Sequence, residues 1–153
     1  MSGILETHFD KFTFRVPTDR RYTADGVWVC RLDPPESERV RVGVTDFMQQ
    51  RSGDVAFVTV RPPGTRLSAA DDVAEIETIK VNVALRSPVA GTVAEVNPAL
   101  DSSPELVNQD PYGDGWLAVI AVTNWNADCD GLLTPEAYVA FIRQEAQDAA
   151  EPS

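Results

Sequence analysis

Short apolar stretches separated by proline and glycine recur along the whole chain, and this pattern constrains its fold more than any other feature. The stretches cover residues 27–32, 40–44, 54–60, 73–79, 81–85, 89–96 and 116–122. Pro34-Pro35 and Ser87-Pro88 fall between stretches. Proline has no backbone N–H to donate to a strand ladder, so these positions indicate strand ends. Many short strands with closely spaced turns predict an antiparallel sandwich or barrel.

A few segments have helical signals instead. Thr45 can cap a short helix that Gly53 ends, and residues 104–108 suggest one or two helical turns. A C-terminal helix is expected after Thr134, a good N-cap, with an apolar stripe at helical spacing made of Tyr138, Phe141 and Ile142. Residues 12–16 alternate weakly and predict an edge strand. We therefore expect an N-terminal extension over 1–20, one domain over 21–131, and a packed helix with a short tail over 132–153.

Composition excludes several classes of function. The net charge of −11 argues against nucleic acid and anionic membranes as partners, because both require clustered positive charge. No apolar run is long enough to span a bilayer, and residues 1–12 do not resemble a signal peptide, so we expect a cytoplasmic protein. In that reducing compartment Cys30 and Cys129 are expected to be free thiols, Cys30 serving in packing.

The chain offers little for catalysis. Its one histidine, His8, lies in the expected extension, and there is no zinc or phosphate-loop motif, so neither a catalytic nor a metal site is predicted. The chain has 11 arginines but only two lysines, Lys11 and Lys80. Side-chain chemistry that needs a primary amine is therefore confined to two positions.

Lys80 lies within the most informative stretch, AEIETIKVNVALRSPVAGTV, residues 74–93. It falls at a turn between two alternating strands, with Glu77 three residues before it and Ser-Pro-Val-Ala-Gly after the second strand. The stretch resembles lipoyl domains, both those of H-proteins and those of acyltransferases. Biotin carriers share that fold but have methionine on both sides of the lysine, whereas Lys80 lies between Ile79 and Val81. Biotin is therefore a minor alternative.

Longer segments narrow the resemblance. Val-Gly-Val-Thr-Asp-Phe at 42–47, Gly-Asp-Val at 53–55, Asn-Pro-Ala-Leu at 97–100 and the string at 104–116 resemble the glycine cleavage H-protein family. The resemblance runs from Tyr22 to Ile142, with insertions near Pro34 and Asn124. It implies a mainly β barrel-sandwich hybrid, a flattened antiparallel β-sandwich with short helices and a C-terminal helix.

The same resemblance implies a carrier and not an enzyme. Lipoate would be amide-linked to Lys80, which a lipoate-protein ligase would acylate. The neighbours that would present this lysine to the ligase are Glu77, Thr78, Ile79 and Val81.

Two departures from the family bear on the cargo. Gly26-Val27 replaces a His-Glu pair, and Ala84 stands where the family commonly has Asp. Those acids suit a cationic aminomethyl group, although Asp25 is close enough in sequence to substitute for the glutamate.

Three functions follow, in order of preference. The first is a lipoyl carrier in heterodisulfide-reductase-like sulfur oxidation, because residues 77–81 and 45–55 resemble its lipoate-binding proteins. The alternative is a glycine cleavage H-protein that carries aminomethyl between glycine decarboxylase and aminomethyltransferase. A further alternative is a non-covalent β-sandwich binding module with an unmodified Lys80.

Overall fold

The computed structural model describes residues 3–150, so the end of the expected C-terminal tail, residues 151–153, lies outside the described part. Eleven strands, two 3-10 helices and four α-helices follow one another in the described residues: β1 Ile4–Phe9, β2 Phe12–Pro17, β3 Arg21–Tyr22, β4 Val27–Arg31, η1 Pro35–Ser37, β5 Arg39–Val44, α1 Asp46–Ser52, β6 Val55–Val60, β7 Arg66–Leu67, β8 Asp72–Thr78, β9 Asn82–Arg86, β10 Gly91–Val96, η2 Pro98–Asp101, α2 Leu106–Gln109, β11 Ala118–Val122, α3 Trp125–Cys129 and α4 Pro135–Ala150.

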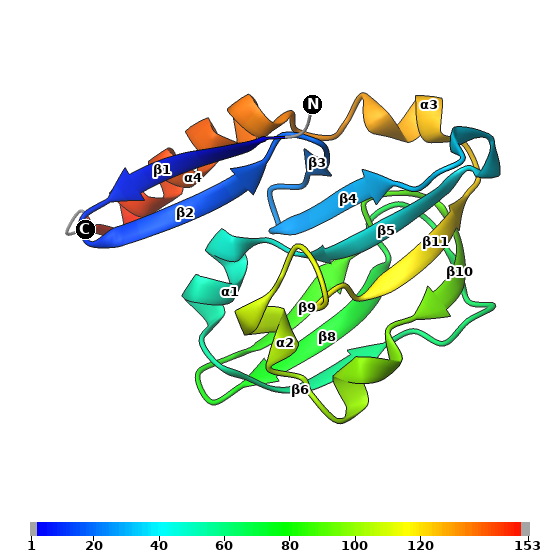
Figure 1. The fold of residues 1–153 in the computed structure, drawn as a ribbon, viewed down its shortest axis with the longest axis horizontal. Coiled ribbons are helices and arrows are strands. Elements are labelled where there is room, and N and C mark those ends of the chain that lie inside the picture. The colour runs from blue at the N-terminus through cyan, green and yellow to red at the C-terminus, as the bar shows by residue number, and fades with distance from the viewer. Residues whose placement is uncertain (1–2, 151–153) are drawn as a thin grey trace.

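Two antiparallel sheets form the body of the molecule. One has six strands in the order β3-β4-β5-β11-β10-β7, and the other has three in the order β6-β8-β9. Figure 1 shows the three-stranded sheet below β4, β5 and β11. The mainly β sandwich with short helices and a C-terminal helix is thus confirmed.

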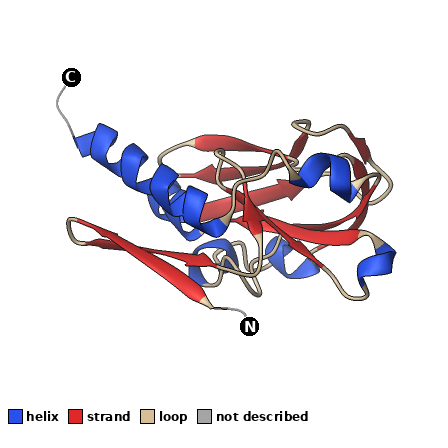
Figure 2. Ribbon diagram, turned by 90° about the horizontal axis from the view of Figure 1, so that it is seen from above, coloured by secondary structure: helices blue, strands red, loops and turns tan. Residues whose placement is uncertain are grey.

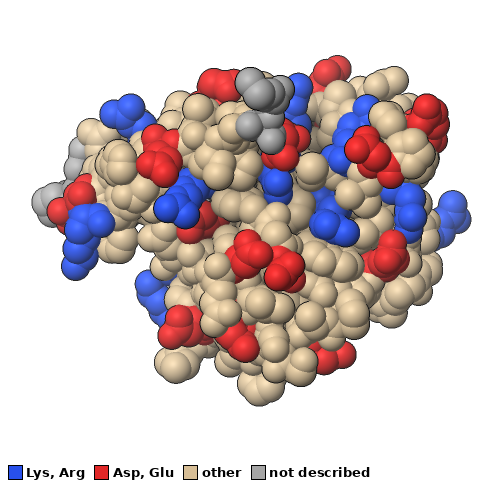
Figure 3. Space-filling model, in the orientation of Figure 1, with Lys and Arg blue, Asp and Glu red and all other residues tan. Residues whose placement is uncertain are grey.

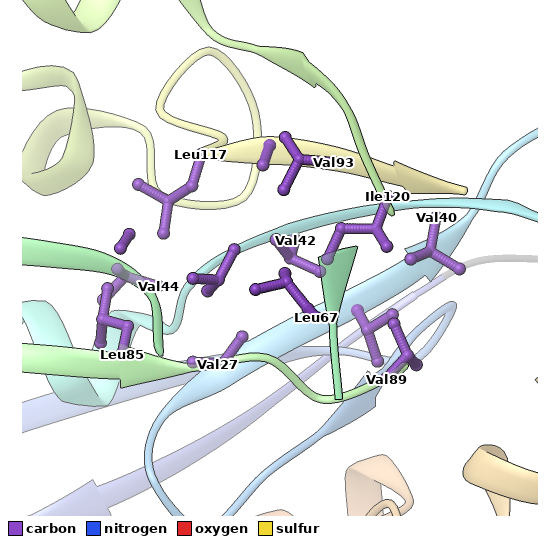
Figure 4. Packing of buried hydrophobic residues seen from close by; sticks show 14 of the residues in the cluster. Val27, Val40, Val42, Val44, Leu67, Leu85, Val89, Val93, Leu117 and Ile120 are labelled. Atoms are coloured by element: carbon purple, nitrogen blue, oxygen red, sulfur yellow. The ribbon is translucent and has the colours of Figure 1, made fainter. Parts of the chain in front are cut away.

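The main core lies between the two sheets. Val42 and Ile120 from the larger sheet and Ile76 and Leu85 from the smaller one are fully buried in a single cluster (Figure 4). Alternation along each strand directs one set of side chains into this cluster and the other set outward. The periodic apolar residues of the sequence are therefore those that lie on the inner faces of both sheets.

A second apolar cluster joins the N-terminal hairpin and α4 to the body. The β1–β2 hairpin forms a two-stranded sheet of its own, and Figures 1 and 2 place it with α4 at one end of the molecule. Phe14 and Val16 of β2 pack with Trp28 of β4 and with Tyr138 and Ile142 of α4. The aromatic stripe expected of the C-terminal helix is therefore core.

Side chains of α1 and of the loop after α2 close the free edge of β2. Gln50 Nε2 donates to the Thr13 carbonyl at 3.0 Å, and the Arg15 amide donates to Asp46 Oδ2 at 3.0 Å. The Tyr112 hydroxyl donates to the Arg15 carbonyl at 2.6 Å. These bonds satisfy backbone groups that an edge strand otherwise leaves to water, and they fasten the hairpin to α1.

The local predictions succeeded in part. Thr45 caps α1, accepting from the Met48 amide at 3.2 Å, and Gly53 ends the helix with a positive φ of 87°. The expected strand over 12–16 exists, but its partner is β1, which was not predicted, and α3 was also missed. Neither has a clear apolar period: β1 mixes apolar, acidic and hydroxyl side chains, and α3 is only five residues long.

Within residues 3–150 no helix is both long enough and apolar enough to cross a membrane.

Candidate functional site

Lys80 lies in the turn between β8 and β9. The two strands pair antiparallel from Asp72↔Arg86 to Glu77↔Asn82, which leaves residues 78–81 to form the turn. Behind the turn, Ile76 and Leu85 are fully buried in the core. The lysine is therefore carried at the tip of a hairpin whose base is rigid.

The side chain of Thr78 organises this turn. Its Oγ1 accepts from the amides of Lys80 at 3.1 Å and Val81 at 2.9 Å, and it donates to the Val81 carbonyl at 3.0 Å. The Thr78 amide donates to the same carbonyl at 2.8 Å. Two-residue hairpin loops usually need a positive φ, yet neither Ile79 nor Lys80 has one. The hydroxyl supplies the acceptor for the Val81 amide instead.

The residues around the lysine are unusually exposed. Ile79 is 97% exposed and Val81 is 41% exposed, although both are apolar. Lys80 itself is exposed, and its Nζ donates to the Arg51 carbonyl near the end of α1 at 3.1 Å. All five residues named in advance, Glu77 to Val81, thus lie together at the tip of the hairpin.

A groove of about 560 Å³ runs beside the turn, between β9 and α1. Its lining is partly apolar and partly charged. The apolar side chains are Phe47 and Met48 from α1 and Val83 from β9. The charged groups belong to Asp25, Arg51 and Lys80. The Arg51 guanidinium lies 5.3 Å from the Phe47 ring centre and pairs with Glu145 of α4 at 3.7 Å. An aliphatic chain attached to Lys80 has both apolar and charged surface within reach.

The positions that depart from the family differ in their relation to this groove. Val27 is fully buried in the main core, whereas Ala84, Gly26 and Asp25 line the groove. Gly26 has a φ of +90°, and a Cβ there would lie 2.7 Å from that of Met48. A side chain at position 26 would therefore collide with Met48, so the presence of Met48 requires glycine here. Asp25 is the one carboxylate among the lining residues.

The remaining candidates lie elsewhere. Cys30 and Cys129 are half-buried free thiols. Burial raises the pKa of the Cys30 thiol, which outweighs the opposite effect of Arg20, so this thiol is a poor nucleophile. His8 lies on β1, where its Nδ1 is 2.9 Å from Thr13 Oγ1.

Sequence reasoning missed three residues near the lysine: Met48 and Arg51 in the groove, and Phe57 on β6, which is 66% exposed. The spacing of Met48 and Arg51 along α1 gave a signal, because residues three and four apart share a helix face. For Phe57 there was none, since a β-bulge between Val55 and Phe57 interrupts the alternation of β6.

Comparison with known proteins gives one consistent result. The family model described as glycine cleavage H-protein matches residues 20–145. The glycine cleavage system H protein of Chlorobium limicola is 42% identical over 127 residues, which are 83% of this chain and 97% of that protein. The protein of the same name from Thermus thermophilus is 40% identical over 131 residues, 86% of this chain and 98% of that one.

Structural comparison agrees. The crystal structure of a glycine cleavage system H protein from Mycobacterium marinum superposes with a TM-score of 0.71 at 32% identity, covering 85% of this chain and 98% of that one. The range of the family model excludes residues 1–19, which hold β1 and β2.

Proposed function

This chain belongs to the glycine cleavage H-protein family, and we propose that it is the aminomethyl carrier of a glycine cleavage system, with lipoate amide-linked to Lys80. Proteins of this family are not enzymes but carry lipoate on a lysine within a multienzyme system. The partners would be glycine decarboxylase, aminomethyltransferase and the ligase that attaches lipoate. A cytoplasmic location stays a prediction.

The observation that carries the proposal is the position of Lys80 on an exposed, internally bonded turn beside a groove. Lys11, the other lysine, lies at the β1–β2 turn, outside the matched residues 20–145. The groove has an apolar wall, formed by Phe47, Met48 and Val83, that fits an aliphatic arm. When bound, the lipoyl group supplies a dithiol that carries the cargo through sulfur.

The chain's own residues have three tasks in this function. Thr78 holds the turn, the apolar wall shields the arm from water, and Asp25 can meet a cationic group in the groove. A carboxylate next to an ammonium ion favours the charged form and gives a charge-assisted hydrogen bond. This favours the aminomethyl cargo, because Asp25 supplies the acid that Val27 and Ala84 lack.

Sulfur oxidation, preferred from the sequence, is the second candidate. It rests on the resemblance of residues 77–81 and 45–55 and on the missing acids at Val27 and Ala84, of which Ala84 lines the groove. The relatives described above are named glycine cleavage system H protein, and this supports the aminomethyl carrier better.

Intact mass after co-expression with a lipoate ligase tests the attachment site. We expect one added lipoyl group on the wild-type chain and on the Lys11→Arg control, and none on Lys80→Arg. An unmodified wild-type chain would instead support the non-covalent binding module.

The cargo needs a second assay with the lipoylated chain, glycine decarboxylase, aminomethyltransferase and glycine. We expect glycine-dependent aminomethyl loading, and weaker retention of the group by Asp25→Asn than by a matched Asp54→Asn variant. Asp54 is exposed and is not among the groove residues. Full lipoylation without any loading would favour the sulfur carrier.

A further inference from the structure

Exposed large apolar side chains gather at the lysine end of the smaller sheet. Five such residues occur in the described part of the chain, and three of them, Phe57, Ile79 and Val81, lie on β6 or in the β8–β9 turn. Phe57 is the one aromatic among these three and is two-thirds exposed. Single exposed apolar residues need no explanation, but an aromatic next to an exposed apolar turn indicates a contact surface.

The register of the sheet brings Phe57 close to the lysine turn. Phe57 pairs with Glu77, and Val58 pairs with the fully buried Ile76. Glu77 is exposed and lies three residues before Lys80. Phe57 and Glu77 are therefore neighbours on the outer face of the sheet. Directly opposed residues in an antiparallel pair have Cβ atoms about 5 Å apart.

A β-bulge is responsible for the outward direction of Phe57. Strict alternation would place Val55 and Phe57 on the same face, but Val55 is buried and Phe57 is exposed. The register shift between these two residues adds one residue to β6 and reverses the face. An apolar side chain that a bulge turns away from the core contributes little to folding.

Negative charge borders this apolar surface. Glu75 lies opposite Thr59 on the same outer face, two residue pairs further along the strands from Glu77. Among the described residues, neither glutamate forms an ion pair. In the view of Figure 3 acidic side chains predominate over basic ones in the lower half, where Figure 1 places α2, η2 and the smaller sheet.

We propose that Phe57, Glu77, Ile79 and Val81 form the docking surface for the enzyme that acylates Lys80, and that this enzyme covers Phe57 with an apolar pocket edged by basic residues. The inference rests on the proposed lipoylation of Lys80. In that reaction Lys80 Nζ attacks the acyl carbon of an activated lipoyl donor. The amide bond forms, the activating group leaves with the electron pair of its bond to that carbon, and Nζ loses a proton.

Geometry requires that the acylating enzyme contact this surface. Lys80 lies at the end of a short turn, so an enzyme that encloses its amine also covers Ile79 and Val81. Phe57 and Glu77 are the next outward side chains on the neighbouring strands. Charge complementarity then favours a basic rim on the enzyme, and a buried aromatic at the centre is the common form of an interface hot spot.

The test measures kcat/KM for lipoylation of the full chain by a purified lipoate-protein ligase with lipoate and ATP, followed by intact mass. We expect Phe57→Ser to lower kcat/KM about tenfold. The matched control is Phe12→Ser, an exposed phenylalanine on the N-terminal hairpin that is 45% exposed, and it should react at the wild-type rate. Thermal melting of each variant verifies that the fold is retained.

Charge is tested separately. We expect Glu77→Lys to lower kcat/KM more than Glu77→Gln does, with the difference shrinking as salt is added. Phe57→Ser and Glu77→Lys variants that react as fast as wild type would overturn the docking surface while leaving the attachment site intact. A wild-type chain that accepts no lipoate would instead overturn the proposed function.

Discussion

The substitution Thr78→Val removes the side-chain hydroxyl from the lysine turn with almost no change in the shape of the side chain. The hydroxyl accepts two amide hydrogen bonds and donates a third, all between 2.9 and 3.1 Å. An intramolecular hydrogen bond contributes about 0.5–1.5 kcal/mol net, and the low end applies here because the amides become accessible to water. Three bonds at about 0.5 kcal/mol each give about 1.5 kcal/mol of lost preference for the native turn.

This loss should act on modification and not on the global fold. A preference of about 1.4 kcal/mol corresponds to a factor of ten in an equilibrium constant, so the native turn loses about one order of magnitude against other turn conformations. We expect kcat/KM for lipoylation of Thr78→Val to fall five- to tenfold. The free energy of unfolding should change by less than about 1 kcal/mol, because valine is at least as favourable as threonine in a strand.

Intact mass over time gives the lipoylation rate, and urea unfolding gives the stability. Thr78→Ser restores the hydroxyl and should recover most of the rate, which separates the hydrogen bonds from the shape of the side chain. Lipoylation of Thr78→Val at the wild-type rate would refute the assignment of Thr78 as a positioning residue, provided the variant is folded.

Two further predictions concern the fold that supports the site. Gly43→Ala should reduce the free energy of unfolding in urea by about 1–3 kcal/mol, because the added Cβ would lie 2.5 Å from the ring of the buried Trp28; unchanged stability would mean that the ring can move away. Burial raises the pKa of all three tyrosines, Tyr22, Tyr112 and Tyr138. Because the fold favours their neutral form, stability is intact below the unfolded-state pKa of about 10 and falls as pH rises above it. Tyrosinate absorbance should therefore appear together with the loss of near-ultraviolet circular dichroism, and a separate titration of the folded protein near pH 10 would contradict the burial.

The sequence allowed good prediction wherever a local rule determined the structure. The β8–β9 hairpin, the Thr45 cap of α1 and the helix after Thr134 each depend on neighbours within a few residues. The position of Lys80 in the turn between two strands could be predicted for the same reason, since these strands and the turn are contiguous.

Contacts between distant segments were beyond such reasoning. The β1–β2 hairpin is attached to the body through Tyr112, whose hydroxyl reaches a carbonyl 97 residues earlier in the chain. The neighbourhood of Phe57 and Glu77 depends on a bulge, and one extra residue reverses which face of a strand is buried. Neither the hairpin's partners nor the bulge leaves a periodic signal in the sequence.

The position of α1 connects these distant parts to the site. Asp46 and Gln50 hold the edge of β2 and Phe47 packs edge-to-face against Phe14 of that strand, while Met48 and Arg51 line the groove together with Phe47. Residues three and four apart share a helix face, so this helix of seven residues presents one face to the N-terminal hairpin and another to the groove. The hairpin lies outside the range of the family model. It supports α1, which forms one wall of the groove, and none of its own residues line the groove beside Lys80.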